Sequence, residues 1–93
     1  MRDAVRYVLF YDMGPAGAEM ARQLYPAHQK WFEQFMRRGV LLSLGRFADG
    51  DAGAMGIFTS REAAEEFAAA DPLVLNEVVG TWRVREWRTV NAE

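Results

Sequence analysis

The stretch VLLSLGRFADGDAGAMGIFT, residues 40–59, decides the fold because it places two strands in direct succession in the middle of the chain. Its two ends, Val40–Gly45 and Ala54–Thr59, are rich in aliphatic and aromatic side chains of the kind found in strands. The residues between them, RFADGDAG, are rich in Gly and Asp, as hairpin loops are. We therefore predict two neighbouring strands that pair antiparallel.

A helix is predicted on each side of this hairpin. Before it, a first helical turn or two is compatible with Ala18–Leu24, but Pro26 suits the first position of the main helix, which would end at Arg38, since Gly39 is a typical C-terminal stop. After it, Ser60 is a residue type that caps helix N-termini, and the spacing of apolar residues predicts a helix over Arg61–Ala70. The hairpin therefore lies between two helices.

The segments that flank these helices complete the pattern. The chain must turn at Asp71, because the residue before a proline disfavours helical backbone, and Asp71 also suits the N-cap of a short helical piece through Leu75. Two further strands are predicted, Val5–Asp12 near the start and Val79 to about Arg88 near the end.

The resulting order of strand, helix, strand, strand, helix, strand is that of a ferredoxin-like βαββαβ unit. In this α+β fold, two helices cover one face of a four-stranded antiparallel sheet. With 93 residues and no internal repeat or linker, the chain is expected to form one domain, residues 1–93.

The opposite face of the predicted sheet has no cover within the chain. Its strands nevertheless carry apolar residues at both alternating positions, as Leu41 and Leu42 illustrate, where a solvated face would show polar alternation. A second copy of the same chain is the simplest source of cover, so we expect a homodimer whose two sheets face each other around a pocket. Trp82 and Trp87, at opposite parities of the last strand, would then serve both layers.

Composition restricts the classes of partner. Thirteen acidic and eleven basic side chains give a net charge of -2, which argues against a nucleic-acid surface. The absence of cysteine excludes disulfides and thiolate metal sites and is compatible with a reducing compartment. No apolar run approaches the roughly 20 residues that span a bilayer. We expect a soluble, cytoplasmic protein with neither nucleic acid nor membrane as a partner.

His28, the single histidine of the chain, is the first candidate for chemistry. In the predicted topology the two helices run antiparallel, so His28, early in the first helix, should lie near Asp71 at the end of the second. A carboxylate bound to one imidazole nitrogen leaves the other free to exchange a proton with a substrate. The alternative is a structural histidine beside an Asp-Pro turn, and the residues by themselves leave both interpretations open.

The segments YPAHQKWFEQFMRRGVLLSLG, REAAEEFAAADPLV and VREW resemble, in order and spacing, the YciI-like (YCII-related) proteins, a family within the dimeric α/β-barrel group. The resemblance covers roughly Val5 to Trp87. It implies a ferredoxin-like fold, dimerisation and a site centred on a histidine and an aspartate, which by position are His28 and Asp71.

Two departures from the family pattern fall near the expected pocket. Tyr25 stands where many members have an arginine before Pro-Ala-His, and Arg46 stands where a proline often follows the glycine of the second strand. Losing an arginine weakens the case for an anionic ligand, whereas Arg46 could restore a guanidinium from another direction. Arg46 is therefore either a surface charge or a substrate contact. Core or pocket-wall positions are expected for Tyr7, Tyr11, Tyr25 and Trp31, and of these Tyr25 and Tyr7 are the candidates for substrate contact.

Other chemistries find little support. One histidine cannot make a two-imidazole metal site, and Asp12, Asp49 and Asp51 lack the spacing of a calcium loop, so no metal and no cofactor are predicted. The interpretation preferred here is a cofactor-independent lyase or isomerase in which His28 acts as general acid or base and Asp71 orients it. Dehydrohalogenation is implied by the family resemblance alone. The alternatives are a module that binds a small aromatic or anionic ligand without transforming it, or an accessory dimeric protein.

Overall fold

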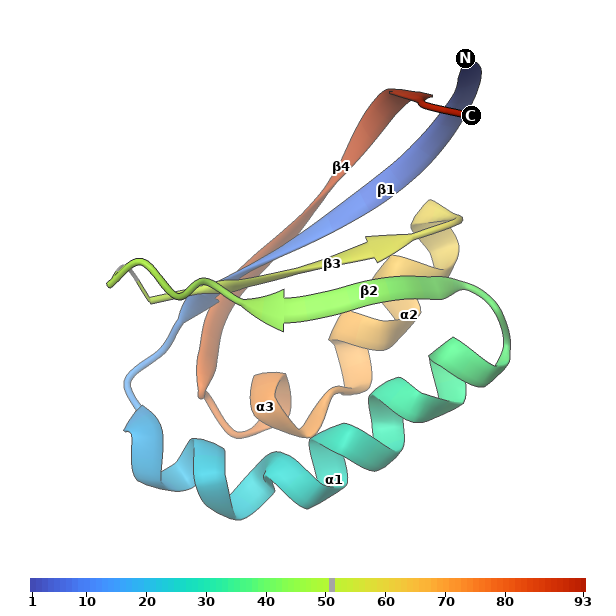
Figure 1. Ribbon diagram of the computed structural model, residues 1–93. Helices are drawn as coiled ribbons and strands as arrows, with labels where there is room; N and C mark the ends of the chain where they lie inside the picture. The colour runs from blue at the N-terminus through green and yellow to red at the C-terminus, as the bar shows by residue number, and fades with distance from the viewer. Residues whose placement is uncertain (51) are drawn as a thin grey trace.

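The computed structural model describes residues 1–50 and 52–93 (Figure 1). Asp51, one of the acids considered as a metal ligand, lies outside this range. The elements are, in chain order, β1 (Arg2–Met13), α1 (Gly17–Arg37), β2 (Leu41–Arg46), β3 (Ala54–Phe58), α2 (Arg61–Ala70), α3 (Pro72–Leu75) and β4 (Val79–Asn91).

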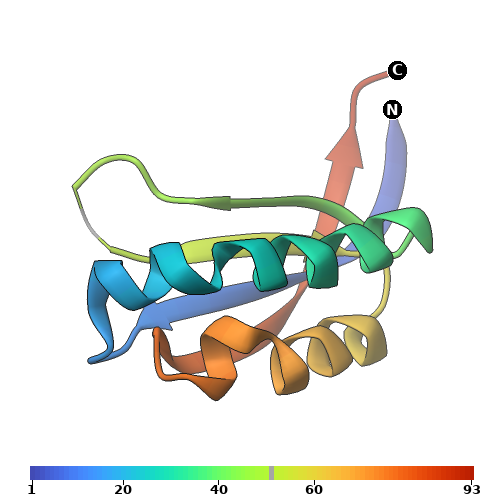
Figure 2. The same ribbon diagram turned by 90° about the horizontal axis from the view of Figure 1, so that it is seen from below.

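The four strands form one antiparallel sheet in the order β2-β3-β1-β4, and the three helices lie on one of its faces (Figures 1 and 2). The predicted ferredoxin-like α+β fold is confirmed. α1 and α2 run antiparallel across the sheet (Figure 2), and the Arg38 side chain just after α1 contacts Glu66 of α2 at 3.2 and 3.3 Å. Among the described residues, no helix combines the length and the apolar character needed to cross a bilayer.

α1 corrects the prediction that a helix begins at Pro26. It begins at Gly17 and continues through Pro26, which lies inside it. The physical reason is a continuous apolar stripe at helical spacing, from Leu24 on to Trp31 and Phe35, whose burial outweighs the backbone hydrogen bond that a proline cannot donate. The predicted C-terminal stop is confirmed, since Gly39 adopts φ 75°.

α2 follows its prediction residue for residue. The Ser60 side chain accepts a hydrogen bond from the backbone N–H of Ala63 at 3.1 Å and so caps the helix. Three alanines bring α2 close to the sheet, and Phe67 between them is fully buried. The centre of the core is made of four residues from four elements that are at most 1% exposed, namely Leu9, Phe35, Phe58 and Phe67.

β1 and β4 are longer than predicted and extend past the rest of the sheet as a two-stranded ribbon (Figure 1). β3 pairs with β1 only over residues 7–11, whereas β4 pairs with β1 from Arg2, which lies opposite Asn91. Among the residues that the structure describes, residues 2–6 and 87–91 therefore have only each other as strand neighbours.

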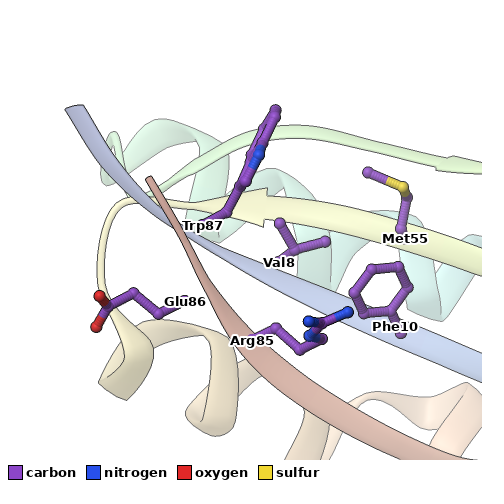
Figure 3. A pocket seen from close by; sticks show the side chains of 6 residues that line it. All are labelled: Val8, Phe10, Met55, Arg85, Glu86 and Trp87. Carbon is purple, nitrogen blue, oxygen red and sulfur yellow. The ribbon is translucent and has the colours of Figure 1, made fainter. Parts of the chain in front are cut away.

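The face of the sheet away from the helices, called the open face below, carries an apolar patch bordered by arginines, since Arg83 lies opposite Phe10, Arg85 opposite Val8 and Arg6 opposite Trp87. Its side chains include Val8, Phe10, Met55, Ile57 and Trp87. They surround a hollow of about 230 Å³ lined by Val8, Phe10, Met55, Arg85, Glu86 and Trp87, with the Glu86 side chain pointing away from the others (Figure 3). Trp87 is 50% exposed here, while Trp82 packs against the core on the opposite side. The two tryptophans thus serve opposite faces, as their parity predicted.

Candidate active site

Two helices and one strand meet around the carboxylate of Asp71. His28 lies in the middle of α1, on its apolar stripe. Asp71 lies at the junction of α2 and α3, where Pro72 forces extended backbone with φ -63° and ψ 128°. Because the helices are antiparallel, this junction faces the middle of α1, and β1 passes beneath both.

The Asp71 carboxylate is completely buried and receives three donors. Its Oδ1 is 2.9 Å from Nδ1 of His28 and accepts a second hydrogen bond, at 3.0 Å, from the backbone N–H of Leu73. Its Oδ2 accepts a hydrogen bond from the Tyr11 hydroxyl at 2.7 Å. The predicted meeting of His28 and Asp71 is thus present in the structure, while its catalytic role stays a prediction.

The hydrogen-bond network selects one tautomer of His28. A carboxylate can only accept hydrogen bonds, so Nδ1 carries the proton that faces Asp71 and, in the neutral ring, Nε2 is left as the acceptor. Within the described residues no protein group bonds Nε2, yet every fully buried side-chain nitrogen and oxygen has a partner. Nε2 therefore keeps some contact with solvent, although the His28 side chain is only 9% exposed.

The contact with Asp71 also affects the pKa of the Tyr11 phenol. Burial of the phenol, the negative charge of Asp71 and the hydrogen bond between them all raise the Tyr11 pKa far above its ordinary value of 10.0. The hydroxyl is therefore protonated at neutral pH, and it serves as a donor to Asp71.

Aromatic rings enclose His28. Tyr25, Phe32 and Phe67 approach the imidazole edge-on, with ring centroids 5.9, 5.2 and 6.3 Å away. The Trp31 indole donates a hydrogen bond to the Phe67 carbonyl at 2.9 Å and ties α1 to α2 beside the pair. These contacts hold the ring in one orientation and give its surroundings an apolar, aromatic character.

The structure places the three expected substrate contacts differently. Tyr25 is 51% exposed and lies next to His28, and its role as a pocket wall stays a prediction. Arg46 lies opposite Ala54, which lies opposite Tyr11, so the two outer residues occupy one row on the helix side of the sheet, about 10 Å apart across two strand spacings. Tyr7 is four residues from Tyr11 along β1, about 13 Å away, with the Arg61 guanidinium over its ring.

The sheet separates the His28–Asp71 pair from the hollow on the open face. Tyr11 contacts the pair from the helix side, whereas Val8 and Phe10 alternate with it and line the hollow. A pocket formed by two facing sheets would therefore not contain the pair, contrary to the arrangement expected from the sequence.

Tyr11 was expected from the sequence only in the core or the pocket wall, not as a partner of Asp71. Its parity with Tyr7 and Leu9 on one face of β1 was visible, but β1 is apolar at both parities, so no pattern distinguished the helix side from the open side. As for metals, the part of the chain that the structure describes brings together no group of three or more His, Cys, Asp or Glu side chains that could hold an ion.

Comparisons with solved structures reveal similar folds. The 5-chloro-2-hydroxyhydroquinone dehydrochlorinase from Burkholderia phenoliruptrix AC1100, solved in complex with 2,5-dihydroxybenzoquinone, is 21% identical, with a TM-score of 0.63 over 87% of this chain and 92% of that one. A protein from Shewanella oneidensis is 19% identical, with a TM-score of 0.57 over 95% of this chain and 92% of that one. No curated protein sequence matches significantly.

The family comparison covers nearly the whole fold. The model of the YCII-related domain matches residues 5–88, a range that begins in β1, ends in β4 and includes Tyr11, His28 and Asp71. The chain therefore belongs to the YCII-related domain family.

Proposed function

We propose that the protein is a small-molecule enzyme of the lyase or isomerase type, in which His28 exchanges a proton with the substrate and Asp71 orients it. The observation that carries the proposal is the buried bond between Nδ1 of His28 and Oδ1 of Asp71, together with an Nε2 that has no protein partner among the described residues and touches solvent. An imidazole nitrogen that reaches solvent can exchange a proton with a bound substrate.

The proposed chemistry uses this chain's own side chains. Nε2 takes a proton from a hydroxyl or an acidic carbon of the substrate, and the resulting imidazolium keeps its Nδ1–H bonded to the Asp71 carboxylate, which stabilises the positive charge. If a halide X⁻ departs with its bonding electrons from a position conjugated to the deprotonated atom, the net reaction is the loss of HX from the substrate. If the proton returns to another atom, the reaction is an isomerisation.

Single-ring hydroxylated aromatics are the substrate class that we propose. The rings of Tyr25 and Phe32 beside His28 suit an aromatic substrate. The similar fold of a protein described as a dehydrochlorinase and bound to a dihydroxybenzoquinone supports the same class. We also propose that Tyr25 lines the site, that Arg46 contacts an anionic group, and that Tyr7, on the helix side of β1, adds a more distant contact to the substrate.

A homodimer is part of the proposal. The open face of the sheet exposes half of Trp87 and carries Phe10, Met55 and Ile57, and a second copy of this face would cover them. Each copy would then keep its own His28–Asp71 pair on the helix side, and the interface would serve stability rather than chemistry.

The test is a turnover assay on chlorinated hydroquinones, followed by chloride release and by the absorbance of the quinone product. The unaltered protein should turn over at least one of them, and His28→Ala and Asp71→Asn should each lower the rate by about a hundredfold or more. Glu65→Gln, which neutralises an exposed acid on α2, is the matched control and should keep the full rate.

Two outcomes would contradict the proposal. Equal rates for the unaltered protein and His28→Ala would remove His28 from the chemistry. Saturable binding of these compounds without turnover would make the protein a binding module instead.

A further inference from the structure

Tyr11, His28 and Asp71 form a buried hydrogen-bonded cluster, and Tyr11 is the member to which the proposed chemistry gives no role. Its side chain is 4% exposed, and its hydroxyl is 2.7 Å from Oδ2 of Asp71. It cannot supply a proton to a substrate, because it has almost no access to solvent and burial beside Asp71 raises its pKa. A buried hydroxyl bonded to an orienting carboxylate can still act through that carboxylate.

The geometry around Asp71 shows what the hydroxyl controls. Oδ1 is shared by Nδ1 of His28 and the backbone N–H of Leu73, so Oδ2 is the oxygen left for a third donor. Without a donor at Oδ2, the carboxylate would hold a buried, unsatisfied oxygen and could relieve it only by rotating, which would move Oδ1 away from His28. With Tyr11 in place, the carboxylate has donors from α1, from the α2–α3 junction and from β1, and together they fix the orientation of its plane.

We propose that Tyr11 is a positioning residue: by holding Oδ2 of Asp71, it keeps Oδ1 directed at Nδ1 of His28 and so fixes Nε2 as the nitrogen that meets the substrate. The catalytic importance of this role rests on the proposed function. The orientation of His28 itself can be tested without any substrate. Tyr11 lies on β1, whereas His28 and Asp71 lie on helices, so its action links the sheet to the orientation of the imidazole.

The test uses the imidazole nitrogen signals of His28 in NMR spectra, which need no assignment because the chain has one histidine. Spectra are recorded at a pH above the imidazole titration, where the nitrogen shifts report the tautomer. The unaltered protein should hold the Nδ1–H tautomer, with an Nδ1 proton that exchanges slowly with water. Tyr11→Phe should move the population toward Nε2–H and speed the exchange of the Nδ1 proton about tenfold or more, as expected when a bond to a charged group is lost.

Two controls separate positioning from packing. Tyr7→Phe makes the same chemical change on the same strand and face, at a hydroxyl that does not bond Asp71, and should leave the His28 signals unchanged. Asp71→Asn should abolish the tautomer preference. A loss of thermal stability in Tyr11→Phe with unchanged nitrogen signals would overturn the inference and assign Tyr11 to packing alone.

The unaltered protein offers a second readout in case Tyr11→Phe does not fold. The Tyr11 hydroxyl proton should appear as a downfield signal protected from exchange, and its absence would overturn the inference. Turnover separates this inference from the proposed function. If Tyr11→Phe shifts the tautomer while no chlorinated hydroquinone reacts, the positioning role stands and the proposed reaction falls. If turnover is found, Tyr11→Phe should lower kcat more than it raises KM.

Discussion

The phenol of Tyr11 is held in its protonated form by two neighbouring influences, the apolar core around it and the carboxylate in front of it. In the unfolded chain both are lost, and the phenol ionises near pH 10. This difference between the folded and unfolded states makes the stability of the protein depend on pH in a direction that can be worked out.

We predict that Tyr11 makes the folded protein sensitive to alkali. Below pH 10 both states hold the phenol proton, so the stability that the bond contributes is fully present. Above pH 10 the unfolded chain releases its proton first, and the free energy of unfolding should fall by about 1.4 kcal/mol per pH unit from this group. Denaturant unfolding at pH 9 to 11 measures the slope, and Tyr11→Phe should show a smaller one.

The absorbance of phenolate provides the check on this prediction. While the protein stays folded, alkaline titrations of the unaltered protein and of Tyr11→Phe should have the same amplitude, and the difference of one phenol should appear only on unfolding. A larger amplitude for the unaltered protein in the folded range would contradict the raised pKa of Tyr11.

Arg46 carries a second prediction. It shares a row of the sheet with Tyr11 on the helix side, and its side chain makes no ion pair or hydrogen bond within the described residues. We expect small aromatic carboxylates to raise the melting temperature, increasingly with concentration, and Arg46→Ala to weaken this effect while sparing neutral phenols. Arg37→Ala removes the same charge from the end of α1 and should bind as the unaltered protein does. An equal response in both variants would assign Arg46 to the surface.

The pairing of His28 with Asp71 could be predicted because it depends on topology, which the order of elements determines. The presence of Tyr11 beside this pair could not be predicted, because it depends on which face of β1 meets the helices. Both faces of β1 are apolar, with Leu9 buried on the helix side and Val8 buried on the open side. Only the packed structure distinguishes them.

α1 shows how a helix can retain a residue that opposes it. Pro26 cannot donate a hydrogen bond to the preceding turn, and its ring crowds the carbonyl four residues earlier. The preference of proline for the first position of a helix therefore led to a predicted start at Pro26, nine residues after the observed start at Gly17. The apolar spacing that joins the half-buried Leu24 to the buried His28 and Phe35 across Pro26 was the better guide, since packing contributes more to helix stability than one lost bond costs.

We predict that Pro26→Ala stabilises the protein, because it restores the missing donor at an exposed position of α1. The free energy of unfolding should rise by about 1 to 3 kcal/mol. Ala27→Gly, at the next exposed position, is a control that should weaken the helix, and it should lower the free energy of unfolding by about 1 kcal/mol. Urea denaturation measures both. A Pro26→Ala variant less stable than the parent would show that the proline ring makes a contact worth more than the bond.

The open face of the sheet concerns the protein as an assembly. Val8 is buried there even in the single chain, and Ile57, its partner across β1 and β3, is half-buried. Apolar strands facing away from the helices could be recognised in the sequence by their lack of alternation. What the sequence could not indicate is that the proposed interface and the His28–Asp71 pair lie on opposite sides of the sheet.

We predict that Ile57→Asp prevents dimerisation, because two carboxylates would be buried without partners at a symmetric interface. Sedimentation at micromolar concentration should give a dimer for the unaltered protein and a monomer for the variant. Leu75→Asp, which puts the same charge at an exposed apolar position of α3, should remain dimeric. A monomeric unaltered protein would contradict the proposed assembly.

The place of β1 in the sheet has a consequence for how the protein is made. β1 lies between β3 and β4, and its pairing with β4 joins residues as distant as Arg2 and Asn91. A ribosome produces β1 first of the four strands and β4 last, so one edge of the nascent β1 stays without a partner while the helices and the hairpin emerge. Exposed apolar strand edges invite aggregation. The segment around Val8 and Leu9 is therefore where a nascent chain would need a chaperone until β4 has been synthesised.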